Sequence, residues 1–150
     1  MRVLSCDPGP DKQDGTTGYA YQDENSLYEM GDIFSAAEFF KGWDLQEKPI
    51  DYIVVEGYYP LPGKEVMHYY RPNKTSEQIG RIKMWAELND IPIHEYRPAD
   101  KPKECKATQV FPKKVPKAIE HRLDAYNHGR WFLIEKGLAL TALELEVLKS

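Results

Sequence analysis

The stretch VLSCDPGPDKQDGTTGYAYQ, from Val3 to Gln22, places Asp7 at the end of a short apolar run and follows it with a Pro-Gly break. Aspartate, proline and glycine together are ordinary turn residues, so Asp7 can be interpreted as the start of a turn. The alternative is a functional carboxylate. That alternative requires partner residues elsewhere in the chain.

Length and composition predict one globular domain over residues 1–150, because 41% hydrophobic and 12% aromatic residues argue against disorder. No stretch approaches the roughly 20 apolar residues that span a bilayer, and no signal-like segment precedes Asp7. We therefore expect no membrane association and a cytoplasmic location, in the host cytoplasm if a phage encodes the protein. The two cysteines, Cys6 and Cys105, are expected to be free thiols in a reducing compartment.

Charge is distributed unevenly along the chain. The net charge is -4, yet basic residues crowd the segment from Lys101 to Arg122. Charge alone leaves two interpretations open, a solvated surface loop or a contact for a polyanion. The basic residues are Lys101, Lys103, Lys106, Lys113, Lys114, Lys117 and Arg122, against Glu104 and Glu120.

Sequence patterning predicts both strands and helices. Alternating or β-branched apolar runs indicate strands, and apolar residues at helical spacing behind a Ser, Thr or Pro indicate helices. In chain order the predicted elements are strands at 1–6, 16–22 and 26–33, a helix at 34–48 capped by Ser35, a strand within 50–59 that ends at Glu56, a loop at 60–73, a helix at 75–90 that begins at Thr75 or Ser76, a strand at 91–98, a helix at 117–136 opened by Pro116, and an amphipathic segment at 140–150.

This order predicts an α/β fold with a mixed five-stranded sheet, three antiparallel strands followed by parallel ones, flanked by helices. In this arrangement, that of ribonuclease H, the first and fourth strands lie side by side. Asp7, near the end of the first strand, and Glu56, at the end of the fourth, would then meet.

Two further candidate residues lie on the last long helix. His121 precedes Asp124 by three positions, which places both on one helix face. His121 alone would be interpreted as a surface or core histidine, but the spacing to Asp124 favours a site. Because clustered carboxylates repel one another, gathering Asp7, Glu56 and Asp124 is physically reasonable when divalent cations lie between them. Carboxylate oxygens favour Mg²⁺ or Mn²⁺.

At this point the chain resembles the RuvC-like Holliday junction resolvases of bacteria and phages, within the ribonuclease H-like nuclease superfamily. The resemblance spans most of the chain and rests on the order and spacing of several motifs together. The motifs are VLSCDPG followed by TGYA, DYIVVEGYY, NKTSEQIGR leading to NDIPIHEYRP, and HRLDA in the last long helix.

The resemblance implies a crossover junction endodeoxyribonuclease whose catalytic and metal-binding residues are Asp7, Glu56, His121 and Asp124. His121 takes a position where family members have an acid or a histidine, and it would ligate a metal or order the attacking water. Two Mg²⁺ ions, replaceable by Mn²⁺, would be bridged by Asp7 about 4 Å apart. One ion would activate water and the other would stabilise the leaving oxygen. The products would be a 5′ phosphate and a 3′ hydroxyl.

The resemblance also implies a partner, branched DNA with a four-way junction. An aromatic residue shortly after the second acid helps to open the junction centre, and Tyr59 or its neighbour Tyr58 matches; the alternative is that these tyrosines anchor a loop. Lys101 and Lys103 match a basic position near DNA phosphates. A four-way junction has near two-fold symmetry, so a homodimer is expected. Gly80 would permit close helix approach at its interface.

Other functions remain open from the sequence. A relative could process flap or fork DNA or structured RNA, because the segment CKATQVFPKKVPK replaces the glycine-containing basic stretch usual before the last helix. A non-catalytic junction-binding protein is a further alternative. Its phosphate contacts would be weakened by three nearby carboxylates without metal, so the acids argue against it.

Neutralising Lys113, Lys114 and Lys117 together is expected to flatten the dependence of DNA binding on log salt by about one unit per lost phosphate contact. The three lysines crowd the segment just before the helix that carries His121 and Asp124. Junction-binding titrations at several salt concentrations measure the slope. An unchanged slope would remove these lysines from the interface.

Overall fold

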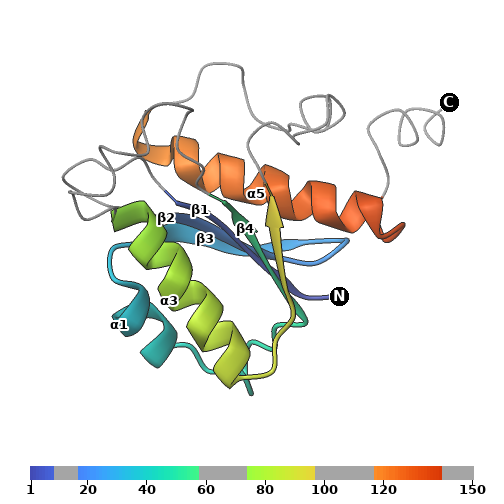
Figure 1. Ribbon diagram of the computed structural model, residues 1–150. Helices are drawn as coiled ribbons and strands as arrows, with labels where there is room; N and C mark the ends of the chain where they lie inside the picture. The colour runs from blue at the N-terminus through green and yellow to red at the C-terminus, as the bar shows by residue number, and fades with distance from the viewer. Residues whose placement is uncertain (9–16, 58–73, 97–116, 140–150) are drawn as a thin grey trace, which may run out of the picture.

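We describe a computed structural model of the chain for residues 1–8, 17–57, 74–96 and 117–139 (Figure 1). None of the helices in these ranges is long and apolar enough to cross a membrane. The elements are β1 (Val3–Pro8), β2 (Thr17–Gln22), β3 (Leu27–Ile33), α1 (Ala36–Lys41), β4 (Tyr52–Glu56), α3 (Lys74–Leu88), β5 (Ile93–Tyr96) and α5 (Lys117–Glu135).

Strand β1 lies at the centre of a five-stranded sheet of order β3-β2-β1-β4-β5. β1 pairs with β2, and β2 with β3, in antiparallel fashion, whereas β1 with β4 and β4 with β5 are parallel. The predicted α/β fold with a mixed sheet is therefore confirmed. Because Cys6 pairs with Val55, the next residues along the two strands, Asp7 and Glu56, reach the same edge of the sheet.

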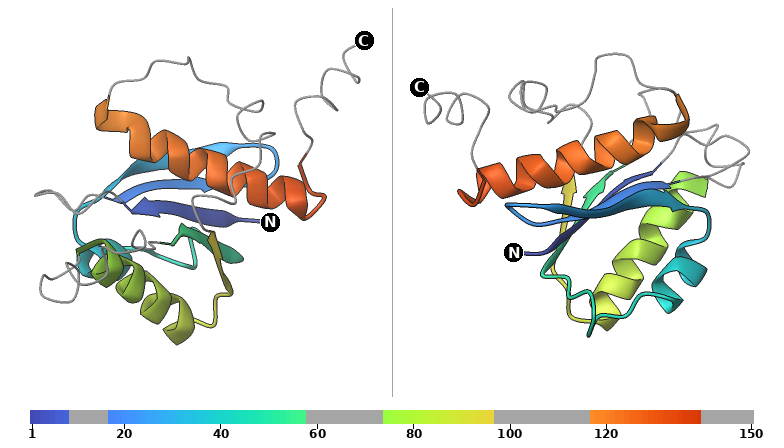
Figure 2. Two further views of the ribbon diagram at one scale, coloured as in Figure 1. Left: turned by 45° about the horizontal axis from the view of Figure 1, so that its top comes forward. Right: turned by 180° about the vertical axis from the view of Figure 1, so that it is seen from behind.

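The sheet separates two helical layers. Figures 1 and 2 show α5 running across one face, with α1 and α3 on the opposite face. Phe40 of α1 stacks on Trp85 of α3 with ring centroids 4.4 Å apart, which joins the two helices of that layer.

Strand alternation sends different side chains to the two layers. Leu4 and Cys6 of β1 lie in the apolar core beneath α1 and α3, whereas Val3 packs with residues of α5. Asp7 has the same parity as Val3, so it faces α5. In β4, Val54 packs on the α5 side. Glu56, two residues further, therefore faces α5 as well.

The predicted helix at 34–48 is wrong in its length, because α1 covers only Ala36–Lys41. Its cap was predicted correctly, since the Ser35 side chain accepts a hydrogen bond from the backbone N–H of Glu38. The helix stops at Gly42, where glycine is a poor helix former. The side chain of Asp44 then accepts a hydrogen bond from the Gln46 backbone at 2.9 Å, which favours a turn over a continued helix.

The turn interpretation of Asp7 is excluded, because β1 continues to Pro8 and Asp7 pairs with Gly18 of β2. Strand β4 ends at Glu56 as predicted. Helix α3 begins at Lys74, one residue before the predicted start at Thr75 or Ser76, and it ends at Leu88.

Gly18 allows α5 to approach the sheet closely. A Cβ at this position would lie 2.2 Å from the carbonyl carbon and 2.3 Å from the carbonyl oxygen of His121, where no side chain fits. Next to it, the Arg122 guanidinium donates to both carboxylate oxygens of Asp32 on β3, at 3.0 and 2.6 Å. Gly18, which has no side chain, and the ion pair between Arg122 and Asp32 therefore set the distance between α5 and the strands.

Gly18→Ala is expected to lower the free energy of unfolding by about 1–3 kcal/mol, because the new methyl group must displace the backbone of α5. Urea unfolding measures the change. Gly80→Ala is the matched control, since no described atom lies within 4 Å of a Cβ at Gly80. In this exposed helical position alanine is expected to stabilise the protein by about 0.5–1 kcal/mol. Equal stability of the Gly18→Ala variant and the wild type would contradict the close packing.

Candidate functional site

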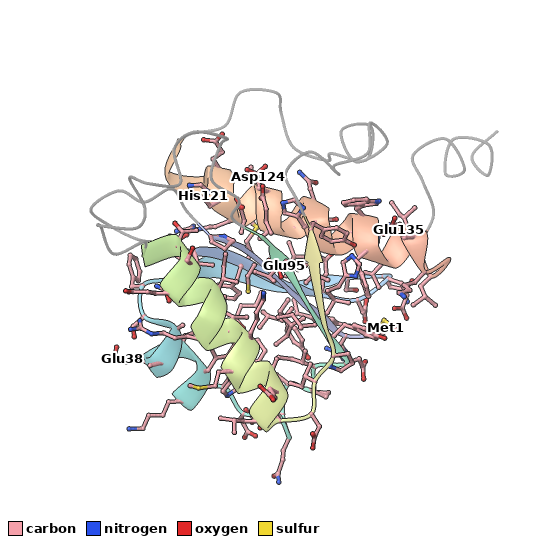
Figure 3. The ribbon with its side chains drawn as sticks, viewed as in Figure 1. Met1, Glu38, Glu95, His121, Asp124 and Glu135 are labelled. Atoms are coloured by element: carbon pink, nitrogen blue, oxygen red, sulfur yellow. The ribbon has the colours of Figure 1, made fainter. Side chains whose placement is uncertain are left out.

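Polar side chains from three elements meet between α5 and the sheet. His121, Asp124 and His128 follow one another at i, i+3 and i+7 on α5, a spacing that places them on one helix face. Opposite them, β1 carries Asp7 and β4 carries Glu56. Figure 3 shows His121 and Asp124 on the N-terminal half of α5.

Two contacts join the helix to the strands. Nδ1 of His121 lies 3.0 Å from Oδ2 of Asp7, and Nε2 of His128 lies 2.8 Å from Oε2 of Glu56. The side chains form two groups, Asp7 with His121 and Asp124, and Asp7 with Glu56 and His128. Within each group the potential ligand atoms lie within 4.8 Å of one another. Asp7 belongs to both groups and so occupies the centre of the cluster.

Burial and repulsion act together on Asp7, which is only 4% exposed. Burial is the main reason that its pKa is raised well above the ordinary value, and the neighbouring charges of Glu56 and Asp124 raise it further. The hydrogen bond with His121 acts in the opposite direction. That same hydrogen bond raises the pKa of His121. Bound protons therefore relieve the repulsion where no cation does so.

The donor set fits a hard divalent cation. Carboxylate oxygens dominate both groups, and a histidine nitrogen completes each of them. Mg²⁺ and Mn²⁺ prefer oxygen ligands, and imidazole is compatible with transition metals. A cation beside Asp7 would also replace the protons as the source of positive charge.

The cluster is open on one side and closed on the other. The side chain of His121 is 31% exposed, whereas that of His128 is 2% exposed. Glu56 lies between these extremes at 14%. Solvent and any substrate therefore reach the cluster from the side of His121, and His128 forms its interior wall.

The structure brings together the four side chains predicted as a site, Asp7, Glu56, His121 and Asp124; their catalytic role stays a prediction. Sequence reasoning missed His128. The signal was present, because His128 follows Asp124 by four positions on the predicted helix and so shares its face.

The other predicted site residues lie outside the described residues. For Lys117, which opens α5, only the backbone is described. The predicted site residues that lie wholly outside the described ranges are Tyr58, Tyr59, Lys101, Lys103, Lys113 and Lys114. Gly80 is exposed on α3 and makes no close helix contact within the described chain.

Comparison of the sequence with protein-family models and with curated proteins gives no match. Comparison of the structure with solved structures does. Thermus thermophilus RuvC in complex with a Holliday junction substrate superposes with a TM-score of 0.64 at 15% identity, over 94% of this chain and 99% of that one.

Two further neighbours come from eukaryotic systems. The fowlpox virus resolvase, solved with Holliday junction DNA, matches with a TM-score of 0.58 at 15% identity, over 91% of this chain and 99% of that one. The yeast mitochondrial Holliday junction resolvase Ydc2 matches at 0.52 and 9% identity, over 92% and 80%. The resemblance inferred from the sequence motifs is thus confirmed for the fold: the chain has the fold of the RuvC-like Holliday junction resolvases.

Proposed function

We propose that the protein is a metal-dependent endonuclease that resolves Holliday junctions and other branched DNA. The observation that carries the proposal is the position of Asp7, which is shared by two groups of possible metal ligands at the edge of a resolvase-like sheet. Two of the neighbouring proteins were solved with Holliday junction DNA. A structural protein would have no evident use for a buried acid, Asp7, with two further acids beside it.

Asp7, His121 and Asp124 would hold one cation, and Asp7 and Glu56 would contribute to a second. When bound, Mg²⁺ or Mn²⁺ would activate a water molecule and stabilise the charge that develops on the scissile phosphate and its leaving oxygen. The chain's own contribution is the geometry of the ligands. The raised pKa values of Asp7 and His121 mean that protons occupy these two positions until a cation takes their place.

Among the described residues, the exposure of His121 favours access for a phosphate backbone from its side of the cluster. The open side carries His121, while the nearby Arg122 is paired with Asp32 and is therefore committed to holding α5 on β3. Phosphate contacts would come instead from the lysines between residues 101 and 117.

We further propose a two-fold symmetric homodimer. A four-way junction has near two-fold symmetry, so two opposed active sites can nick two opposed strands. Each nick would leave a 5′ phosphate and a 3′ hydroxyl, and Tyr59 or Tyr58 would contact bases at the branch point.

Asp7→Asn is expected to reduce junction cleavage in Mg²⁺ by orders of magnitude, because it removes the carboxylate shared by both groups while nearly preserving its shape. Junction binding in Ca²⁺ or EDTA is expected to remain. Asp90→Asn makes the same chemical change at the end of α3, where the φ of 54° suits asparagine, and should cleave as the wild type does. Gel assays with a labelled four-way junction measure both properties.

Parallel assays on fork, flap, duplex and RNA substrates test the substrate class. Faster cleavage of the four-way junction than of the other substrates supports the proposal. Cleavage of the junction by Asp7→Asn at the wild-type rate would show that this cluster is not the active site.

Asp7→Asn also tests the raised pKa values of Asp7 and His121 in the metal-free protein, in EDTA. Because the pKa of Asp7 is raised in the folded state, that state holds a proton that the unfolded chain loses above a pH of about 4. Wild-type stability therefore falls as the pH rises from there towards the raised pKa. The raised pKa of His121 acts in the same direction, since its contribution is also lost with rising pH. Asp7→Asn removes the first effect and the largest cause of the second.

The melting temperature of Asp7→Asn relative to the wild type is therefore expected to increase with pH. Thermal unfolding of both proteins in EDTA between pH 4 and 8 measures this difference. A difference that stays constant across the range would contradict the raised pKa of Asp7.

A further inference from the structure

His128 is the most buried member of the cluster and is not among the ligands expected from the sequence. Its side chain is 2% exposed, and its Nε2 atom lies 2.8 Å from Oε2 of Glu56. This contact connects the middle of α5 to the end of β4. His128 lies on the buried side of Glu56, away from the open side of the cluster. From there it can orient the Glu56 carboxylate through a hydrogen bond.

The His128 ring is held by its aromatic neighbours. Tyr96 of β5 pairs with Glu56 in the parallel β4–β5 ladder, so its side chain lies beside that of Glu56. The Tyr96 ring is nearly parallel to that of His128, at 18° with centroids 6.0 Å apart. Tyr96 in turn stacks on Trp131 at 4.2 Å. These contacts limit the rotation of the imidazole and fix the direction of Nε2.

Glu56 needs such a constraint more than Asp7 does. Strand β1 continues past Asp7 to Pro8, whereas Glu56 is the last residue of β4 and carries a longer side chain. The side chain of Glu56 lies within hydrogen-bond reach of Asp7, and its negative charge raises the pKa of Asp7. A cation that replaced the proton of Asp7 would remove that hydrogen bond, and Nε2 of His128, 2.8 Å from Oε2, is a donor that can still hold the Glu56 carboxylate.

We propose that His128 is a positioning residue, which donates its Nε2–H to Glu56 and holds that carboxylate in the orientation that binds a divalent cation together with Asp7. The inference rests on the proposed function and adds to it the residue that orients one of its ligands. Hydrogen-bonded partners of metal ligands typically change metal affinity by about 10–100-fold when they are removed.

Two variants separate positioning from packing. His128→Gln keeps an amide N–H close to the position of Nε2 but loses the ring, whereas His128→Phe keeps the ring and loses the donor. A purely structural role predicts that Phe is the better substitute. Positioning predicts that Gln retains metal affinity and that Phe weakens it by about 10–100-fold.

Mn²⁺ titration of the DNA-free protein, followed by electron paramagnetic resonance, gives this affinity without relying on cleavage. Junction cleavage as a function of Mg²⁺ concentration gives a second readout. For His128→Phe the metal concentration for half-maximal rate is expected to rise, with the rate largely restored at high metal. His94→Phe is the matched control, because His94 also packs edge-on against Tyr96 but makes no contact with Glu56 among the described hydrogen bonds.

Wild-type affinity in His128→Phe, in a protein that binds Mn²⁺ tightly, would overturn the inference and leave the proposed nuclease standing. A wild type that binds no Mn²⁺ and cuts no junction would overturn the proposed function, and the inference with it. A ¹⁵N-histidine spectrum of the unaltered protein supplies a check that needs no variant to fold. His128 must carry a proton on Nε2, and a bare Nε2 at neutral pH would overturn the inference.

Discussion

Helix α5 lies so close to β2 that a single methyl group on Gly18 would fall 2.2 Å from the carbonyl carbon of His121. A second glycine makes the same kind of contact from the helix side, because a Cβ on Gly129 would lie 2.3 Å from Nε2 of Gln22. That Gln22 nitrogen donates to the carbonyl of Tyr126 at 3.0 Å. The two close approaches and one cross-layer hydrogen bond fix both the height and the position of α5. Every contact between His121 or His128 and the strand acids depends on that placement.

The two faces of the sheet carry different side chains. One face is apolar, and the other holds the polar cluster beside a smaller apolar one. The face beneath α1 and α3 is apolar, and Leu4 and Val55 on it and Ile82 of α3 above it are all fully buried. Burial of such side chains contributes about 1.5–3 kcal/mol each, so this layer supplies much of the stability. On the α5 side, an apolar cluster around Phe132 covers only the C-terminal half of the helix. The N-terminal half is thereby left for the polar cluster.

The burial of Asp7 and its repulsion by neighbouring acids connect the fold with the proposed function. Asp7 is buried beside other acids, an arrangement that raises its pKa and costs folding free energy without a counter-charge. His121 supplies part of the compensation on the open side, and His128 contacts Glu56 on the closed side. Such a site is stabilised by whatever positive charge enters it. This dependence agrees with the proposed metal-dependent activity.

The sequence by itself determined the order of strands and helices, because period-two and helical patterns are local properties of the chain. The adjacency of β1 and β4 was predicted from the ribonuclease H arrangement that this order resembles, and the structure confirms it. The sequence also indicated Asp7, Glu56, His121 and Asp124, because strand ends and i, i+3 spacing can be recognised in the sequence. Gly42 and the Asp44 turn end α1 locally, but the packing of Trp43 and Leu45 against the core from a non-helical segment was decided by the tertiary structure. The role of Gly18 and the contact of His128 were likewise decided there. Both depend on which residue of β2 or β4 lies opposite which turn of α5, and that register arises only when the helix packs on the sheet.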